Sequence, residues 1–296
     1  FPPLPSEPTS TAGSLLGGSR PSLTPVIPTM LSKPSTGSVV GSAEQIRWVY
    51  RRHVSEPVDR SHPDAEPTAV ANPARAQLGS PTTVLTSDQT ISSPTVWRDE
   101  VIDLAGNLTV TVGGNLTLVN TMVVINGSYD GEYHVEVQSS GTLQARSGSR
   151  VQSIDEFTSY TFTVADGATL SLRDTTVSDI GGSWVPIEED GLYVEADDVV
   201  IENSTFRNND YGVILDGANH SRLRNVSIID GSTYGIYVRD SIDVEVTGSG
   251  AYDATRGVVF LRANDSRFVD TTVSERDTEV RIDQSRNVTV ANNTFV

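Results

Sequence analysis

A turn residue that recurs after short apolar alternations constrains the fold of this chain more than any other feature. From residue 120 onward these turns are separated by 27, 27, 29, 22, 23, 22 and 22 residues. The turn positions are Asn120, Ser147, Asp174, Asn203, Asn225, Gly248, Asp270 and Asn292. A period of this length indicates stacked supersecondary units, each too small to fold alone.

Apolar residues keep fixed places around these turns. Two and four residues before most turns lie apolar side chains, such as Leu170 and Leu172 before Asp174, which is the period-2 pattern of a strand. Another apolar residue follows three positions after most turns. A third apolar pair stands one and three residues after Gly191, Gly212, Gly235, Gly257 and Glu279. We therefore predict an all-β fold, a right-handed parallel β-helix of about eight coils of 22–29 residues with three parallel sheets.

The first 96 residues differ sharply in composition from the rest. They hold fourteen of the fifteen prolines and balanced charges, whereas residues 97–296 carry 14 basic and 31 acidic residues and hence the whole net charge of −17. Such a Pro/Ser/Thr-rich segment buries too little apolar surface to offset its ordering entropy. We predict a disordered linker or tether over 1–96, with either a short docking helix or a fraying helical turn at 43–54, and the β-helix over 97–296.

Charge and composition exclude several classes of function. The acidic excess argues against nucleic acid as a partner. The chain has no cysteine, which excludes disulfides, thiolate nucleophiles and Cys-based metal sites. The longest apolar runs, such as 122–125, are far shorter than the roughly 20 residues of a transmembrane helix. At the C-terminus, Phe295 falls in a core column as the sequence stops, so we expect a continuing chain or another subunit to cover this coil.

The repeats resemble those of a known superfamily. Residues 210–215 and 233–238 read Asp-Tyr-Gly-Val-Ile-Leu and Thr-Tyr-Gly-Ile-Tyr-Val, each followed by an Asx-rich turn. They are similar to the parallel β-helix repeats of the pectate-lyase-like superfamily, including NosD-type and carbohydrate-binding or sugar-hydrolase repeats. The lead-in over 106–118 resembles the opening of secreted archaeal β-helix proteins. This resemblance implies an extracellular or cell-surface location, but the superfamily hosts too many activities to fix a function.

One outer sheet face carries the chemistry that a carbohydrate ligand would need. Alternation along the strands places Tyr193 and Tyr237 in one outward column and Glu195, Asp216 and Arg239 in the next, in coils about 4.8 Å apart. The alternative is a solvated surface with charge pairs between coils. Glu195, Asp216 and Arg239 are also candidate catalytic residues, although the polygalacturonase and alginate-epimerase motifs of this fold are absent from the sequence.

Three further sets of residues are candidate sites. Trp184, near Pro186, is either a sugar-stacking platform or a hydrophobic plug over the sheet. Asp197 and Asp198 offer oxygen ligands for Ca²⁺ or form a solvated acidic turn, so we expect no cofactor apart from this calcium option. Among nine Asn-x-Ser/Thr sequons, those in loop-like breaks are the candidate glycosylation sites, namely Asn126, Asn219 and Asn264.

These features favour a non-catalytic protein of the extracellular space or cell surface. It would bind a polysaccharide or surface glycan, or serve as a stalk or adhesin. One alternative is a carbohydrate-active enzyme, a polysaccharide lyase, epimerase or glycoside hydrolase, that acts on the Tyr193–Arg239 face. A second alternative is a trimeric tailspike of the phage type.

Overall fold

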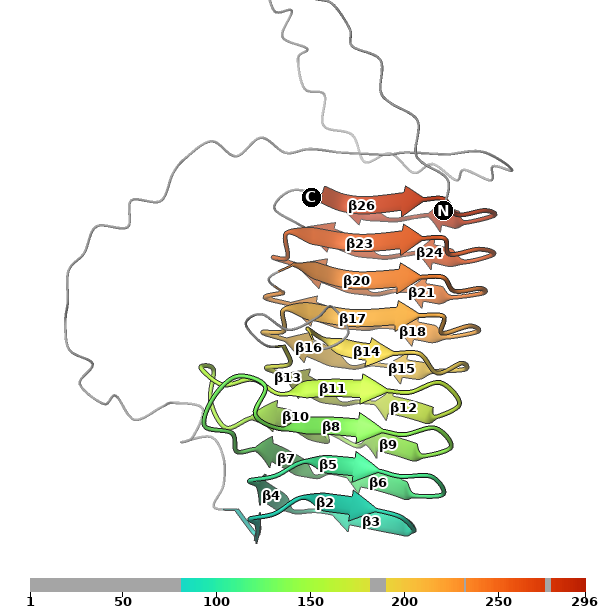
Figure 1. Ribbon diagram of the computed structural model, residues 1–296. Coiled ribbons are helices and arrows are strands. Elements are labelled where there is room, and N and C mark those ends of the chain that lie inside the picture. The colour runs from blue at the N-terminus through green and yellow to red at the C-terminus, as the bar shows by residue number, and fades with distance from the viewer. Residues whose placement is uncertain (1–80, 182–189, 232, 275–277) are drawn as a thin grey trace, which may run out of the picture. The chain divides into compact units, whose positions relative to one another are not determined.

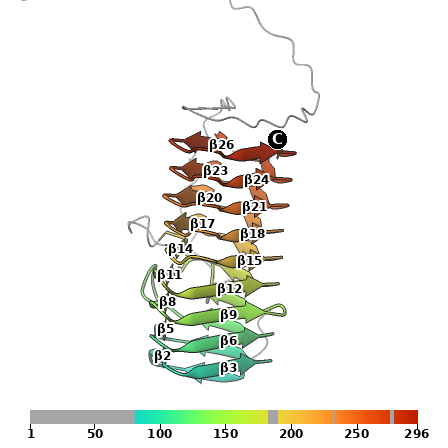
Figure 2. The ribbon, with the colours of Figure 1, turned by 90° about the vertical axis from the view of Figure 1, so that its right-hand side faces the viewer.

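The computed structural model describes residues 81–181, 190–231, 233–274 and 278–296, and all regular elements among them are strands. The strands form three parallel sheets, which Figures 1 and 2 show from two sides. Sheet A contains β3 (Pro94–Arg98), β6 (Asn115–Val119), β9 (Thr142–Arg146), β12 (Thr169–Arg173), β15 (Val200–Glu202), β18 (Arg222–Arg224), β21 (Glu245–Thr247), β24 (Arg267–Val269) and β27 (Thr289–Ala291). Sheet B contains β1 (Thr83–Leu85), β4 (Val101–Leu104), β7 (Met122–Ile125), β10 (Arg150–Ser153), β13 (Thr176–Ser178), β16 (Thr205–Arg207), β19 (Ser227–Ile229), β22 (Gly250–Tyr252), β25 (Thr272–Ser274) and β28 (Thr294–Phe295). Sheet C contains β2 (Gln89–Ile91), β5 (Leu108–Val110), β8 (His134–Val137), β11 (Thr161–Val164), β14 (Leu192–Val194), β17 (Tyr211–Asp216), β20 (Tyr234–Arg239), β23 (Arg256–Leu261) and β26 (Thr278–Asp283).

Each coil contributes one strand to sheet B, then one to sheet C, then one to sheet A. Every strand pairs with the equivalent strand of the next coil, so the three sheets run along the same stack (Figure 1). In sheet A, for example, Leu172 pairs with Ile201, and Ile201 pairs with Leu223. Residues that share a place in the repeat therefore form continuous columns, as the sequence periodicity predicted. The predicted right-handed parallel β-helix is confirmed.

The core fills the space between the three sheets. Its inward columns are apolar and almost fully buried, and they include Leu118, Ile201, Phe206, Val238 and Phe260. The rings of Phe260 and Phe268 meet edge to face, with centroids 6.1 Å apart. Because each inward side chain packs on its counterparts above and below, stability depends on contacts between neighbouring coils.

Left-handed backbone conformation explains the residue types at the turns. All eight turn positions found in the sequence have positive φ values between 48° and 60°. Asn and Asp tolerate this conformation better than other residues with a Cβ. At Asn225 the side-chain amide also donates to the Asn203 Oδ1 at 2.9 Å, so the asparagines of adjacent coils are hydrogen-bonded.

The glycines at the start of the sheet C strands are required for a different reason. A Cβ on Gly212 would overlap the carbonyl oxygen of Gly235 and lie 2.5 Å from the Ile228 Cγ2. A Cβ on Gly235 would lie 2.6 Å from the Gly257 oxygen. Gly212 and the core residue Val213 are consecutive and both face inward, which breaks the alternation of the strand. The backbone therefore bends at the glycine, and the side chain before it, that of Tyr211, turns outward.

The β-helix begins earlier than the sequence predicted. Strands β1, β2 and β3 occupy residues 83–98, so β1–β27 make nine coils rather than about eight, and β28 starts another. Thr95 and Trp97 pair with Leu116 and Leu118 in the same columns as the later coils. Pro94 is compatible with this coil because it is the first residue of an edge strand. Residues 1–80, including the helix expected at 43–54, lie outside the described residues.

The last strand keeps the predicted register. Phe295 pairs with Val273, which places it in the core column that the sequence analysis assigned to it. Its side chain is 48% exposed in the described structure, whereas Val273 one coil earlier is fully buried.

Within the described ranges, no helix is long and apolar enough to cross a membrane.

Candidate functional site

The outer face of sheet C carries three columns of side chains that we name the tyrosine face. The columns follow from the pairing of β14, β17, β20, β23 and β26. They consist of Tyr211, Tyr234 and Arg256; of Tyr193, Ile214, Tyr237, Val259 and Arg281; and of Glu195, Asp216, Arg239, Leu261 and Asp283. The second and third columns are those that the sequence alternation predicted.

The first column was missed by the sequence analysis. Tyr211 and Tyr234 stand directly before Gly212 and Gly235, where the backbone bend turns them outward. Their ring centroids are 5.0 Å apart, and the Tyr237 ring lies 5.1 Å beyond Tyr234. Tyr237 belongs to a second apolar cluster, separate from the core, with Tyr193, Ile214 and Val259, and Tyr211 and Tyr234 pack against it. Tyrosine before glycine at a spacing of 23 residues was the available signal.

Arginine completes this first column. The Arg256 guanidinium lies over the Tyr234 ring, 5.1 Å from its centroid, and its Nη1 donates to the Tyr234 hydroxyl. A cation over an aromatic face is stabilised by the ring quadrupole. The rings of Tyr211, Tyr234 and Tyr237 therefore pack against one another at a tilt, and Arg256 lies against Tyr234.

Asp216 is at the centre of a polar network in the third column. The Tyr193 hydroxyl donates to Asp216 Oδ2 at 2.8 Å and lies 3.3 Å from Glu195 Oε1. The Arg239 Nη2 also donates to Asp216 Oδ2 and forms an ion pair with it. The four candidate residues that the sequence placed in adjacent coils are thus in direct contact, and they form the charge pairs between coils that were the alternative prediction.

These contacts fix the protonation states of the network. Burial would raise the pKa of Asp216, but hydrogen bonds from Arg239 and Tyr193 outweigh it and hold that pKa below its usual value. Burial, with the hydrogen bond to Asp216, raises the pKa of Tyr193 far above the usual range. Burial likewise raises the pKa of Tyr211 to about 12. At neutral pH, Asp216 is a carboxylate and both tyrosines are neutral.

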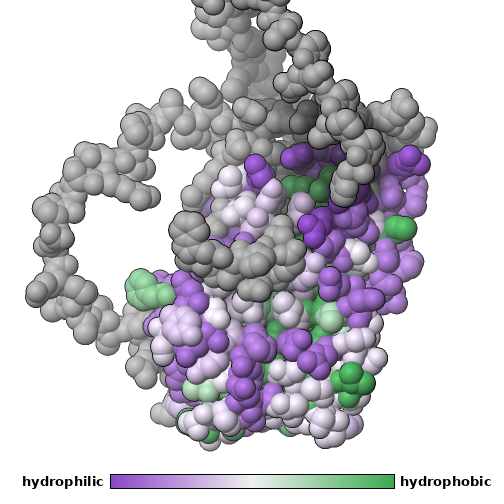
Figure 3. Space-filling model, in the orientation of Figure 1, coloured by the Kyte–Doolittle hydropathy of each residue, from purple (hydrophilic) through white to green (hydrophobic). Residues whose placement is uncertain are grey.

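Burial separates the supporting residues of the face from the accessible ones. In the second column Tyr193 is 6% exposed, Tyr237 is 9% exposed and Ile214 is fully buried, whereas Arg281 at its end is partly exposed. The two tyrosines therefore leave little ring surface for sugar stacking. The charged third column is more open, and Figure 3 shows hydrophilic side chains gathered where β20 and β23 end. A ligand would meet the Asp216–Arg239 pair and the tyrosine edges.

The stability that Asp216 contributes should disappear in acid. A carboxylate whose pKa is lowered by folding stabilises the protein above its unfolded pKa, about 3.9, and loses this contribution as the pH falls through the lower folded value. We expect Asp216→Asn to cost about 1–3 kcal/mol at pH 7. Urea unfolding at pH 7, 5, 4 and 3 measures the difference from the wild type. A difference that stays constant over this range would contradict the assignment.

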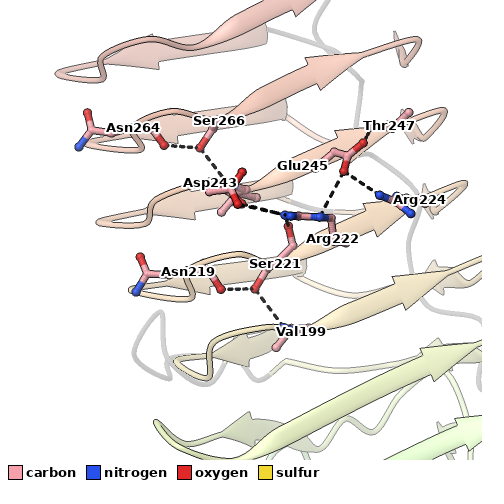
Figure 4. A network of polar contacts seen from close by, with 11 residues as sticks. Val199, Asn219, Ser221, Arg222, Arg224, Asp243, Glu245, Thr247, Asn264 and Ser266 are labelled. Carbon is pink, nitrogen blue, oxygen red and sulfur yellow. Dashed lines mark hydrogen bonds and ion pairs between the residues drawn. The ribbon is translucent and has the colours of Figure 1, made fainter.

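The outer face of sheet A differs from the tyrosine face because its strands β15, β18 and β21 carry ion pairs and contain no tyrosine (Figure 4). Arg222 lies 3.3 Å from both Asp243 and Glu245, and Arg224 lies 2.9 Å from Glu245. These pairs are partly exposed, and such pairs contribute little to stability. Sheet A therefore provides matched charged residues for control variants, without an aromatic cluster.

The other candidate binding residues of the sequence analysis, Trp184, Asp197 and Asp198, are not part of the tyrosine face. Trp184 lies outside the described residues. Asp197 Oδ1 accepts hydrogen bonds from the backbone and side-chain nitrogens of Asn219, and Asp198 is a turn residue with a φ of 56°. No group of three His, Cys, Asp or Glu that could hold a metal is found in the described part of the chain. Calcium binding at Asp197 and Asp198 stays a prediction.

The three sequon asparagines occupy corners of the coils. The Asn126 amide donates to Asp103 at 2.8 Å, and the Asn219 amide donates to Asp197 at 2.9 Å. Asn264 accepts a hydrogen bond from the backbone of Arg286. All three asparagines form hydrogen bonds between coils, and these bonds are a structural reason for asparagine at each position. Glycosylation at these positions remains a prediction.

Comparison with known proteins identifies the family of the chain. A family model described as a right handed beta helix region matches residues 135–295, which is more than half of the chain. No curated protein and no solved structure matches it. The three parallel sheets agree with the description of the family. The chain therefore belongs to the right-handed β-helix family.

Proposed function

We propose that this protein is a non-catalytic, extracellular or cell-surface β-helix that binds a glycan at the tyrosine face. The observation that carries the proposal is the Asp216–Arg239 pair, which is held by Tyr193 beside an aromatic cluster on the outside of the helix. Partly exposed charged groups next to aromatic edges can hydrogen-bond to sugar hydroxyls. The resemblance to secreted members of the pectate-lyase-like superfamily supports the location.

The contacts within the network favour binding over catalysis at this face. The lowered pKa of Asp216 rules it out as a general acid, and the raised pKa of Tyr193 rules it out as a general base. In the opposite roles, Asp216 as base and Tyr193 as acid, each group would first have to release the other and, for Asp216, also Arg239. Both groups are already engaged with each other at 2.8 Å. They are suited to hold a ligand by hydrogen bonds.

The rigid stack supports the same proposal. Repeated coils with a continuous core keep the columns at a constant spacing, and sites on rigid strands are more precisely positioned than sites on loops. A linear polymer with repeating sugar units could therefore contact equivalent groups in successive coils. The same stack could serve as a stalk that presents this face.

A binding and cleavage assay on the full chain tests the function. We expect retention on at least one immobilised polysaccharide without new reducing ends or unsaturated products. Arg239→Ala should weaken this binding at least about tenfold, because it leaves Asp216 without its cationic partner and removes donors from the face. Arg173→Ala, which breaks the Arg173–Glu202 pair on sheet A, is the matched control and should bind like the wild type.

The alternatives predict other results in the same experiment. Cleavage products that Arg239→Ala abolishes would indicate a carbohydrate-active enzyme. A trimer in light scattering would favour the tailspike. Binding that Arg173→Ala weakens as much as Arg239→Ala would move the site away from the tyrosine face. No binding to any polysaccharide would contradict the proposal and leave the stalk.

A further inference from the structure

We infer that the glycan bound at the tyrosine face is an uncharged polysaccharide rather than a uronic-acid or sulfated one. This inference rests on the proposed function and names the class of its ligand. The argument comes from the charge balance of the face and from the contacts that each charged group already makes.

The tyrosine face is electrically neutral although the chain carries a net charge of −17. Its carboxylates equal its guanidinium groups in number. The carboxylates are Glu195, Asp216 and Asp283, and the guanidinium groups are Arg239, Arg256 and Arg281. A face built for a polyanion would instead carry an excess of cationic groups.

Each arginine of the face is engaged by a neighbour. Arg239 is paired with Asp216, and Arg281 Nη2 lies 2.6 Å from Asp283 Oδ2. Arg256 lies over the Tyr234 ring and donates to its hydroxyl. At the adjoining corner, Arg262 makes a two-point contact with Asp240, at 2.5 and 2.6 Å. A ligand carboxylate at Arg239, Arg281 or Arg262 would therefore compete with a protein carboxylate, and one at Arg256 would compete with the Tyr234 hydroxyl.

A neutral sugar faces no such competition. Its hydroxyl groups are uncharged and can both donate and accept, so they can share the charged groups of the face without replacing either partner of an ion pair. Its C–H surface can contact the partly buried Leu261 beside them. A ligand carboxylate in the same place would lie next to protein carboxylates, and like charges at this distance repel.

A matched pair of polymers tests this inference with the full chain. The two ligands are one soluble neutral β-glucan and the same glucan after oxidation of its C6 hydroxymethyl groups to carboxylates. Affinity is measured by titration calorimetry at low and at moderate salt. We expect the neutral polymer to bind at least about tenfold more tightly, with little dependence on salt. Equal or tighter binding of the oxidised polymer would overturn the inference while leaving the proposed function intact.

Removing one carboxylate should change this preference. Asp216→Asn leaves Arg239 without its acidic partner, so the preference for the neutral polymer should fall at least about threefold through tighter binding of the oxidised one. Glu202→Gln makes the same change on sheet A and should leave the preference unchanged. An unchanged preference in Asp216→Asn would contradict the role of this pair. If neither polymer nor any other polysaccharide binds, the proposed function itself fails.

Discussion

Replacing Phe260 with alanine is expected to lower the free energy of unfolding by about 3–5 kcal/mol. Phe260 is fully buried and points into the core from the sheet C strand of its coil. It stacks between Val238 and Ile282 of the adjacent coils and meets the edge of Phe268. The truncation would leave a cavity that the hydrogen-bonded sheets cannot close, because the strand spacing is fixed by the backbone ladders.

Urea unfolding followed by circular dichroism measures this loss, and hydrogen exchange locates it. Since coils stabilise one another only through their neighbours, protection should fall most in β20, β23 and β26 and least in β5 and β8. Leu261→Ala, one residue further along the same strand but on the outer face, is the control and should cost about 1 kcal/mol or less. A cost for Phe260→Ala no larger than this control would contradict the assigned core register.

The fold could be predicted because each structural requirement recurs at the same place in every coil. A buried column must be apolar in all coils, so Leu172, Ile201 and Leu223 mark one column although they are 22–29 residues apart. A left-handed turn limits the residue to Asn, Asp, Gly or a similar type, which marks the corners. Repetition turns each weak local preference into a strong signal.

The first coil was missed because it lacks part of that signal. Around β3 the inward positions are Thr95 and Trp97 rather than two aliphatic residues, and Pro94 resembles the proline-rich segment before it. Strand pairing thus begins before the proline-rich composition ends, since Pro94 is already part of β3. The edge position of β3, which makes the proline acceptable, is a property of the assembled sheet and has no counterpart in local sequence.

The acidic composition has a structural explanation that the sequence analysis did not give. Among the described residues, ten aspartates have positive φ values, and they lie at corners of the coils. Asp is one of the few residues with a Cβ that accepts this conformation, so part of the negative charge serves backbone geometry. The net charge still argues against nucleic acid, but it gives no measure of the charge on the tyrosine face, where carboxylates and guanidinium groups balance.

The candidate site could be predicted in position but not in accessibility. Alternation places Tyr193 and Tyr237 outside and brings Asp216 next to Arg239, because the register between coils has no freedom. Whether an outward ring is open depends on everything packed around it, and these two rings are largely covered. The outward turn of Tyr211 depends on the bend at Gly212, which strict alternation does not predict.

Gly212→Ala is expected to destabilise the protein strongly, by about 3 kcal/mol or more. The new Cβ would overlap the Gly235 carbonyl oxygen, which belongs to the backbone of the next coil and cannot move independently. It would also lie 2.5 Å from the Ile228 Cγ2 in the buried core. Relief would require the coils to separate locally, which would break the pairing of β17 with β20 and disturb the outward turn of Tyr211.

Gly231→Ala provides the matched control, because its Cβ would meet the nearest atom, the Ala254 Cβ, at an ordinary 3.4 Å. We expect this variant to unfold within about 1 kcal/mol of the wild type. If Gly212→Ala proves too unstable to purify, thermal unfolding of Gly235→Ala gives a second reading, since its Cβ would lie 2.6 Å from the Gly257 oxygen. Equal stability of the Gly212, Gly235 and Gly231 variants would show that close approach of the coils is not what requires glycine here. A loss confined to Gly212 and Gly235 would establish that the glycine column sets the spacing on which both the core and the tyrosine face depend.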